Sequence, residues 1–290
     1  MKPAPFEHHA PATVVEAVEM LAQFGDEAKV LAGGQSLVPL LALRLARVEH
    51  LIDVNRIPDL AGIAREDGWL SVGALTRQSV AERSSEAATA IPLLSRALPY
   101  VGHFQIRNRG TVGGSTVHAD PASELPAVAV ALDAELVAVG PGGPRTIPAA
   151  EFYLSTWTTA LAADEVLTSV RYPIWPGRCG FAVEEFARRH GDFAIAGVVC
   201  GVQVAPDGLV QRAAIALFGM GSTPVRARGA EAAFVGLRAS DADRREVAVA
   251  AVQESDPPDD LHGPASYRRR VATYLTETAL DRAIMEATGA

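Results

Sequence analysis

A pair of glycines between a short apolar run and a leucine-rich run is the feature that most restricts the fold of this 290-residue chain. The run 29–32 has the length and apolar character of a buried strand, and the leucines from Leu37 to Leu45 recur at helical spacing. Gly33 and Gly34 lie between them and permit backbone conformations that other residues avoid. The sequence therefore predicts a strand that turns tightly into a helix.

Three successive parts of the chain are predicted to form units with different element orders. Residues 1–56 add a helix between Thr13, a suitable N-cap, and Gly25, a suitable stop, and so form an N-terminal α/β subdomain. Residues 57–175 alternate strand-like and helical segments and form a second α/β subdomain. Residues 176–290 begin with an antiparallel meander and end in three helical segments. Together these parts predict an α+β fold.

A second glycine turn is predicted about 75 residues after the first, at 111–115. Like the first, it combines glycines with a hydroxyl side chain, and Arg107 and Arg109 lie just before it. Glycine lets a ligand approach the backbone closely, and N–H groups at the start of a helix attract anions. Two such turns could together bind a pyrophosphate. Neither matches the G-x-G-x-x-G pattern or a P-loop, so a Rossmann-type dinucleotide site is not indicated.

The composition excludes several classes of protein. The formal net charge is −8 and the basic residues form no stripe, so nucleic-acid binding is not expected. Cys179 and Cys200 are too few for a disulfide scaffold or for an iron–sulfur cluster held by this chain. The most apolar stretch, 125–139, is too short and too charged for a transmembrane segment. The low cysteine count and the absence of a recognisable signal peptide predict a cytoplasmic protein.

Side chains that could catalyse a reaction or bind a metal form no convincing group in the sequence. His8 and His9 are adjacent near a chain end, where histidines are more often solvated than metal ligands. Glu184 and Glu185 fall in a strand-like run, which would direct them to opposite faces instead of pairing them as acid and base. We therefore predict no catalytic residue and no metal site on this chain.

Four segments carry a resemblance to a known family by their order and spacing. They are Ala32-Gly33-Gly34-Gln35-Ser36-Leu37, Ile106-Arg107-Asn108-Arg109-Gly110-Thr111-Val112-Gly113-Gly114-Ser115, His118-Ala119-Asp120-Pro121 and Gly191-Asp192-Phe193-Ala194. Over essentially its whole length the chain resembles the medium, flavin-binding subunits of the xanthine dehydrogenase and aerobic carbon monoxide dehydrogenase family of molybdenum hydroxylases. The resemblance implies a two-subdomain, PCMH-type FAD-binding fold, followed by a C-terminal domain with a small antiparallel sheet and a three-helix bundle.

The resemblance also implies which residues bind FAD. Asp120 would accept hydrogen bonds from the ribityl hydroxyls. Phe193 would lie near the isoalloxazine ring, where many relatives have tyrosine, and Leu167 would approach the flavin. The FAD pyrophosphate would be held by the two glycine segments, whose residues are Ala32, Gly33, Gly34, Gln35, Ser36, Leu37, Thr111, Val112, Gly113, Gly114 and Ser115.

In this family the substrate is oxidised on another chain, and the resemblance implies the same arrangement here. A large subunit would hold the molybdenum cofactor, and a small subunit would hold 2Fe–2S clusters that pass electrons to FAD on this chain. FAD would then reduce an external acceptor such as NAD, a quinone or oxygen. The complex would be a heterohexamer with two copies of each subunit, by analogy with the family.

One departure from the family pattern bears on the substrate. Carbon monoxide oxidisers often carry histidine where this chain has Gln35. We interpret this as favouring a small organic substrate, an N-heterocycle or an aldehyde, over carbon monoxide, and as favouring non-covalent FAD. Two alternatives stay open. A self-sufficient FAD-dependent oxidase or dehydrogenase would need its own substrate cavity, and a non-catalytic assembly protein would not need intact glycine segments.

Overall fold

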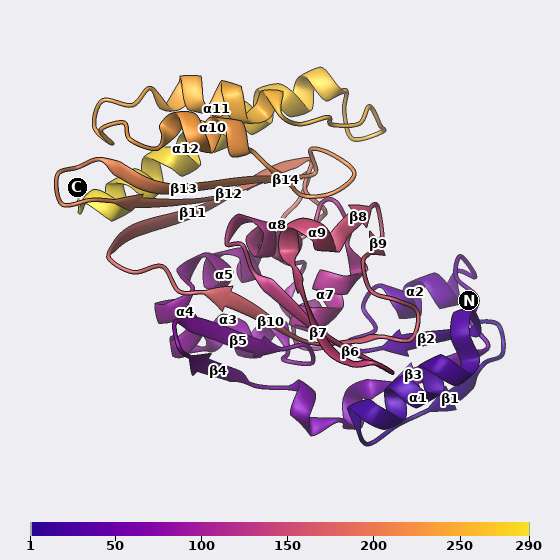
Figure 1. Cartoon of the computed structure of the whole chain (residues 1–290). Coiled ribbons are helices and arrows are strands. Elements are labelled where there is room, and N and C mark those ends of the chain that lie inside the picture. The colour runs from indigo at the N-terminus through magenta and orange to yellow at the C-terminus, as the bar shows by residue number, and fades with distance from the viewer. Residues whose placement is uncertain (1, 290) are drawn as a thin grey trace.

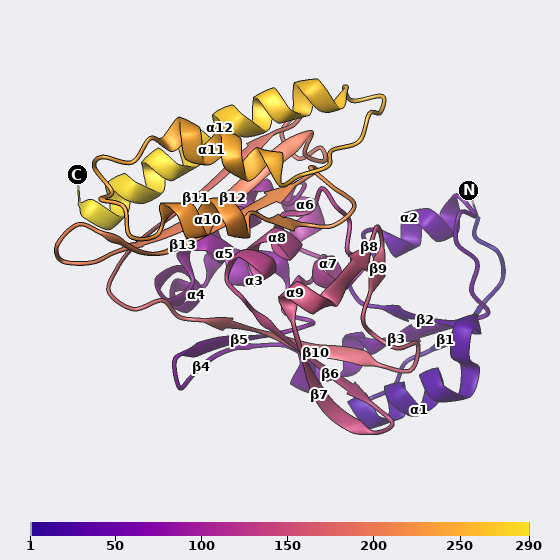
Figure 2. The same ribbon diagram turned by 45° about the horizontal axis from the view of Figure 1, so that its top comes forward.

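The computed structural model describes residues 2–289, which form three larger sheets in three successive stretches of the chain and one small two-stranded sheet in the middle stretch (Figure 1). Figure 1 shows the sheet of the last stretch stacked above helices of the middle stretch, with the sheet of the middle stretch beneath them. The sheet of the first stretch lies to one side of the middle stretch in both views (Figures 1 and 2). This arrangement confirms the predicted α+β class. The division at residues 56 and 175 into separately folding domains stays a prediction.

The first sheet is parallel, with the strand order β1 (Glu7–His9), β3 (His50–Asp53) and β2 (Ala28–Leu31). The helix α1 (Val14–Phe24) packs on it through buried Ala17, Val18 and Leu21. The predicted signals for α1 are confirmed. The Thr13 hydroxyl accepts a hydrogen bond from the N–H of Glu16, and Gly25 ends the helix with a φ of 55°. Tertiary packing of this apolar face supplies most of the stability of so short a helix.

The helix after the first glycine pair is shorter than the leucine spacing predicted. The helix α2 covers only Leu37–Ala42, and Arg44 then adopts a φ of 58° in the left-handed region. Leu43 and Leu45 are exposed in consequence. The leucine run predicted a longer helix because spacing alone does not reveal where the apolar face loses its packing partner.

The middle sheet is antiparallel. Its strand order is β4 (Ile63–Glu66), β5 (Trp69–Gly73), β10 (Val166–Pro173), β6 (Glu135–Gly140) and β7 (Gly143–Pro148). In β6, buried and half-buried residues alternate, as expected for a sheet covered on one face.

The helices that cover that face are α3 (Gln78–Arg83), α4 (Ser85–Ala90), α5 (Pro92–Ala97), α7 (Val112–His118) and α8 (Glu124–Ala131). Short elements fill the connections, namely α6 (Phe104–Arg107), α9 (Ala149–Phe152), β8 (Tyr153–Ser155) and β9 (Thr158–Thr159).

The last sheet is the predicted meander, β11 (Arg178–Phe186), β12 (Ala196–Val204) and β13 (Val210–Phe218), with the short β14 (Val225–Arg226) at its edge. Its central strand β12 is buried along nearly its whole length because helices cover both faces of the sheet. The middle stretch supplies α5 and α8 on one face. The other face packs against α10 (Arg228–Phe234) and α12 (Ala265–Thr288), and α11 (Arg244–Gln253) packs on these two helices. Within residues 2–289, no helix is long and apolar enough to cross a membrane.

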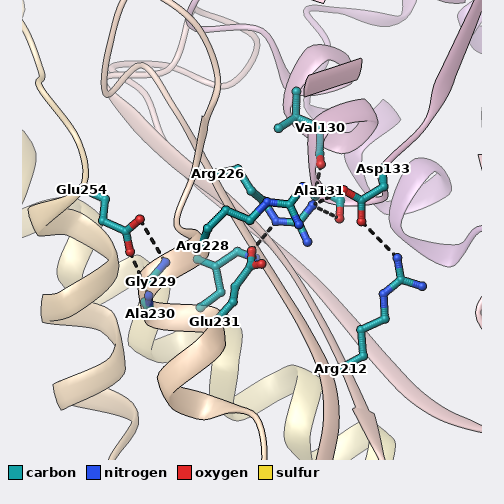
Figure 3. Close-up of polar contacts among 11 residues, drawn as sticks. Val130, Ala131, Asp133, Arg212, Arg226, Arg228, Gly229, Ala230, Glu231 and Glu254 are labelled. Carbon is teal, nitrogen blue, oxygen red and sulfur yellow. Dashed lines mark hydrogen bonds and ion pairs between the residues drawn. The ribbon is translucent and has the colours of Figure 1, made fainter. Parts of the chain in front are cut away.

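Arg226 joins the last stretch of the chain to the middle stretch (Figure 3). Its guanidinium donates hydrogen bonds to the carbonyl oxygens of Val130 and Ala131, at 2.5 and 2.6 Å, at the C-terminal end of α8. It also pairs with Glu231 of α10 and, at 3.4 Å, with Asp133. The last carbonyls of a helix have no hydrogen-bond donors within the helix. Here the guanidinium of an arginine from another sheet donates to two of them, and its positive charge suits the C-terminal end of the helix dipole.

We predict that Arg226→Met strongly destabilises the chain. The Arg226 side chain is only 7% exposed, so the change leaves Glu231 as a buried charge without its partner and removes the donor for two helix carbonyls. The expected loss is about 3–5 kcal/mol in the free energy of unfolding, measured by urea denaturation. The matched control is Arg228→Ala, whose 56% exposed side chain pairs with Asp133 and should cost less than about 1 kcal/mol. Equal losses in both variants would contradict the role given to Arg226.

Candidate functional site

The first glycine segment touches the backbone directly before the second segment, although the two are far apart in the sequence. A Cβ atom on Gly33 would lie 2.5 Å from the carbonyl oxygen of Arg109 and 2.8 Å from the Cα of Gly110. A Cβ atom on Gly114 would lie 3.8 Å from the Cβ of Ala32. Contacts this close leave no room for a side chain on Gly33, so glycine is needed there for space. The predicted pairing of the two segments into one site is consistent with this geometry.

The first glycine segment presents a run of free backbone donors. Among the hydrogen bonds of residues 2–289, none is donated by the backbone N–H groups of Gly33, Gly34, Gln35 or Ser36. Gly34 has a φ of 74°, and the short helix α2 begins directly afterwards at Leu37. Successive N–H groups in a tight turn before a helix form a concave site for an anion. This segment can therefore bind a phosphate group through its backbone.

The second glycine segment is not the turn that the sequence predicted but the first turn of helix α7. Thr111 is the N-cap, and its hydroxyl accepts a hydrogen bond from the N–H of Gly114 at 3.0 Å. The N–H groups of Val112 and Gly113 donate to the carbonyls of Thr76 and Ala74, each at 2.9 Å. These backbone donors are therefore already used.

The glycines of the second segment have a packing role in α7. A Cβ on Gly113 would lie 2.5 Å from the Cβ of Ala74, so glycine lets the helix approach the end of β5. Ser115 is half-buried, and its hydroxyl makes no hydrogen bond within residues 2–289. The second segment thus contributes a rigid wall and a hydroxyl group, while the first segment contributes backbone N–H groups.

Two side chains that the sequence did not point to link the segments by hydrogen bonds. Asn55, which follows β3, donates from Nδ2 to the carbonyl oxygen of Ala32 at 2.8 Å. Arg77 donates to Asn55 Oδ1 at 2.7 Å and also to the carbonyl oxygen of Arg109. A polar bridge therefore runs from the end of the first sheet to the second glycine segment. Neither residue belongs to a recognisable pattern, because their roles depend on contacts between distant parts of the chain.

The arginines around the second segment have different roles. Arg107 is buried and structural, since it pairs with Glu82 at 2.8 Å and donates to the carbonyls of Val101 and Gly102. Arg109 is exposed. The partial burial of Arg77, and secondly the positive charge of Arg109, lower the pKa of Arg77. Two positive charges therefore lie near the junction of the glycine segments, where they favour an anionic ligand.

The other predicted site residues differ in how accessible they are. Asp120 is half-buried and accepts hydrogen bonds from the N–H of Ala122 at 2.9 Å and from Nε1 of Trp157 at 3.1 Å. Leu167 is buried in the sheet, and it lies next to Thr168, whose carbonyl accepts from the N–H of Ala74. Any contact between Leu167 and a ligand would therefore come from its backbone.

Phe193 is 67% exposed and lies in the loop between β11 and β12. Gly191, two residues earlier, lets this loop pack closely against a neighbouring segment. Gly191 has a φ of 83°, and a Cβ on it would lie 2.7 Å from the ring of His103. The loop between β11 and β12 is thus packed on the segment that leads into α6 and the second glycine segment. Its exposed aromatic ring is available for stacking on a planar ligand.

Two carboxyl groups, one buried and one half-buried, have raised pKa values. Burial raises the pKa of Glu124, at the start of α8, to about 7. Burial, and to a lesser extent the charge of Glu124, raises the pKa of Glu185 to about 8. Glu184, its neighbour in β11, pairs instead with Arg282. That Glu184 and Glu185 do not act as an acid–base pair stays a prediction.

Comparison with known proteins identifies relatives over almost the whole chain. Residues 4–175 match the family model described as the FAD binding domain in molybdopterin dehydrogenase, and residues 181–283 match the CO dehydrogenase flavoprotein C-terminal domain. The 6-hydroxypseudooxynicotine dehydrogenase complex subunit alpha of Paenarthrobacter nicotinovorans is 42% identical over 99% of this chain and 97% of its own length. The caffeine dehydrogenase subunit beta of Pseudomonas sp. strain CBB1 is 37% identical over 98% of this chain and 96% of its own. A carbon monoxide dehydrogenase structure from Hydrogenophaga pseudoflava, which lacks the Mo-pyranopterin moiety of its cofactor, superimposes with a TM-score of 0.93 at 40% identity and 98% coverage of each chain.

We predict that Gly33→Ala weakens FAD binding at least tenfold, which corresponds to about 1.4 kcal/mol. The added methyl group would meet the Arg109 carbonyl and force the two glycine segments apart. Flavin fluorescence titration of the purified chain measures the effect. The matched control is Gly142→Ala in the turn between β6 and β7, where a Cβ meets nothing within 4 Å. Unchanged affinity in Gly33→Ala would show that the contact between the segments does not hold the ligand.

We predict that Glu185→Gln flattens the dependence of stability on pH. A carboxyl whose pKa is higher in the folded than in the unfolded chain stabilises the fold fully below its unfolded pKa. For Glu185 this stabilisation is lost as the pH rises from 4.5 through about 8. Over that range the wild-type free energy of unfolding should fall by on the order of 2 kcal/mol more than that of the variant. Urea denaturation across the range measures this, with the exposed Glu151→Gln as a control that should follow the wild type.

Proposed function

Because the chain belongs to the molybdopterin dehydrogenase family, as its FAD-binding medium subunit, we propose that it passes electrons from the 2Fe–2S clusters of a small partner subunit through FAD to an external acceptor. The chain is the flavoprotein subunit of a multi-subunit oxidoreductase that also contains large and small chains. Bound FAD can take up electrons singly and release them in pairs, which suits a relay between one-electron and two-electron carriers. The residues of this chain hold, orient and shield the flavin.

The observation that carries the proposal is the run of free N–H groups at 33–36 against the wall formed by the second glycine segment. A pyrophosphate fits these residues because it is anionic and can accept several backbone hydrogen bonds at once. The Ser115 hydroxyl, in the second segment, and the Arg109 guanidinium, just before it, would complete its coordination. The helix dipoles of α2 and α7 add a favourable field at the same place.

The remaining predicted residues would position the rest of the cofactor. Asp120 keeps lone pairs for ribityl hydroxyls beyond its bonds to Ala122 and Trp157, because an ionised carboxylate has about four acceptor positions. Phe193 would cover one face of the isoalloxazine ring, and that contact would bury its exposed side chain. A phenylalanine provides the stacking surface without the hydroxyl that a tyrosine would offer.

The same site supports non-covalent binding of FAD. Gln35, whose position could tether a flavin if it held a histidine, donates from Nε2 to the carbonyl oxygen of Gly33 at 3.2 Å. An amide in this arrangement stabilises the turn and is not a nucleophile. We therefore propose that acid precipitation of the protein releases its FAD.

For the substrate of the whole complex we propose a small organic molecule, an N-heterocycle or an aldehyde. Gln35 in the first segment and relatives named for caffeine and 6-hydroxypseudooxynicotine support this class. The likeness to a carbon monoxide dehydrogenase makes carbon monoxide the competing substrate. The substrate would bind on the large, molybdenum-containing partner, and the external acceptor would be NAD, a quinone or oxygen.

The geometry favours the relay over a self-sufficient oxidase. A cavity of about 570 Å³ lies between the middle and last stretches and is lined by residues including Tyr100, Phe181 and His190. It includes none of the residues predicted to bind FAD. A self-sufficient oxidase would instead need its substrate cavity directly over the flavin.

The relay is tested on the complex isolated with its partner subunits. We expect flavin absorbance that acid treatment moves into the supernatant, and turnover with caffeine-like heterocycles or aldehydes but not with carbon monoxide. A complex carrying Gly33→Ala should keep substrate-dependent bleaching of the iron–sulfur bands and lose at least tenfold of its turnover with the external acceptor. A flavin-free complex that turns over at the wild-type rate would contradict the proposal.

A further inference from the structure

Two histidines and three glutamates gather at the N-terminal end of the first sheet. They are Glu7 and His9 on β1, His50 at the start of β3, and Glu27 and Glu49 just before β2 and β3. The strands are parallel, so this end of the sheet lies opposite the first glycine segment, which follows the end of β2. None of these residues is among those proposed to bind FAD.

Three of these side chains place their ligand atoms at the spacing of a metal site. His9 Nε2 lies 3.1 Å from His50 Nδ1, and Glu7 Oε2 lies 3.8 Å from the first and 3.6 Å from the second. A point equidistant from these three atoms is about 2 Å from each, which is the length of Zn–N and Zn–O bonds. The three atoms could therefore hold one ion with little movement.

The two imidazoles are fixed before any ion binds. The Phe24 ring, at the end of α1, stacks on His50 with ring centroids 3.8 Å apart and on His9 with centroids 5.0 Å apart. The side chains of His9 and His50 are only 22% and 16% exposed. The expectation that His8 and His9 are both solvated is thus wrong for His9, while His8 is half exposed and pairs with Asp53.

The surrounding charge favours a divalent cation. Glu27 and Glu49 have carboxylate oxygens within 4.8 Å of each other and of a nitrogen of His50, so His50 has three carboxylates near it, including that of Glu7. Two imidazole nitrogens with a carboxylate oxygen suit Zn²⁺, whereas Mg²⁺ and Ca²⁺ prefer oxygen ligands alone. A fourth position stays available to water or to one of the two further glutamates.

We propose that Glu7, His9 and His50 bind one Zn²⁺ ion, which joins β1 to the start of β3. The ion links a strand close to the chain's N-terminus to the central strand of the first sheet, and it stabilises the unit that carries the first glycine segment. It acts in structure and takes no part in electron transfer.

Isothermal titration of the tag-free full chain with Zn²⁺ alone tests the site. One ion should bind per chain, and His9→Gln and His50→Gln should each weaken binding at least tenfold. His8→Gln is the matched control and should leave it unchanged. Saturating Zn²⁺ should raise the midpoint of thermal unfolding by on the order of 5 °C in the wild type and not in His9→Gln. Mg²⁺ at the same concentration should give no saturable binding.

Glu7→Gln keeps the test decisive if the histidine variants fail to fold, because the Glu7 side chain is 73% exposed and its loss should leave the sheet intact. Weaker Zn²⁺ binding by this variant, with unchanged circular dichroism and flavin content, supports the site. Equal Zn²⁺ binding by Glu7→Gln and the wild type, or no saturable binding by the wild type, would overturn it.

Discussion

The backbone contact between Gly33 and the Arg109–Gly110 peptide is the constraint on which the rest of the site depends. It exists only because no side chain separates the two segments. Ala32 also lies close to Gly114 at the start of α7, and the hydrogen bonds of Asn55 and Arg77 connect the first segment to the Arg109 carbonyl. The first and middle stretches of the chain thus meet at the point where the FAD pyrophosphate is proposed to bind.

The layers above the middle sheet keep that point rigid. All eight residues of α8 are buried, since the helix lies between the middle sheet and the last sheet. One hydrophobic cluster includes side chains from both stretches, such as Leu125 and Phe218. Asp120 lies in the short connection between α7 and α8, so its position follows from the packing of both helices. Buried interiors of this kind resist small displacements, and a cofactor site benefits from that.

Local signals predicted the fold better than they predicted the site. Thr13 and Gly25 bound α1 correctly because caps act on neighbouring residues. The turn expected at Thr111 proved to be the start of a helix. The N–H of Gly113 there donates to the carbonyl of Ala74, more than thirty residues earlier in the chain, and spacing does not reveal such a contact. Spacing could not reveal Asn55, whose bond to the first glycine segment needs the folded sheet. The shared glycines and hydroxyl side chains of the two segments already suggested that they act together, and the family resemblance added FAD as the expected ligand.

The Arg226 contact with the end of α8 also has a consequence for synthesis on the ribosome. The carbonyls of Val130 and Ala131 have no hydrogen bond from Arg226 until that residue, nearly a hundred positions later, has been synthesised. At ordinary translation rates that interval is on the order of ten seconds. The apolar face of α5 and α8 also has no covering sheet until the meander, residues 178–218, has been synthesised. Until then the middle stretch of the nascent chain exposes apolar surface that the finished fold buries.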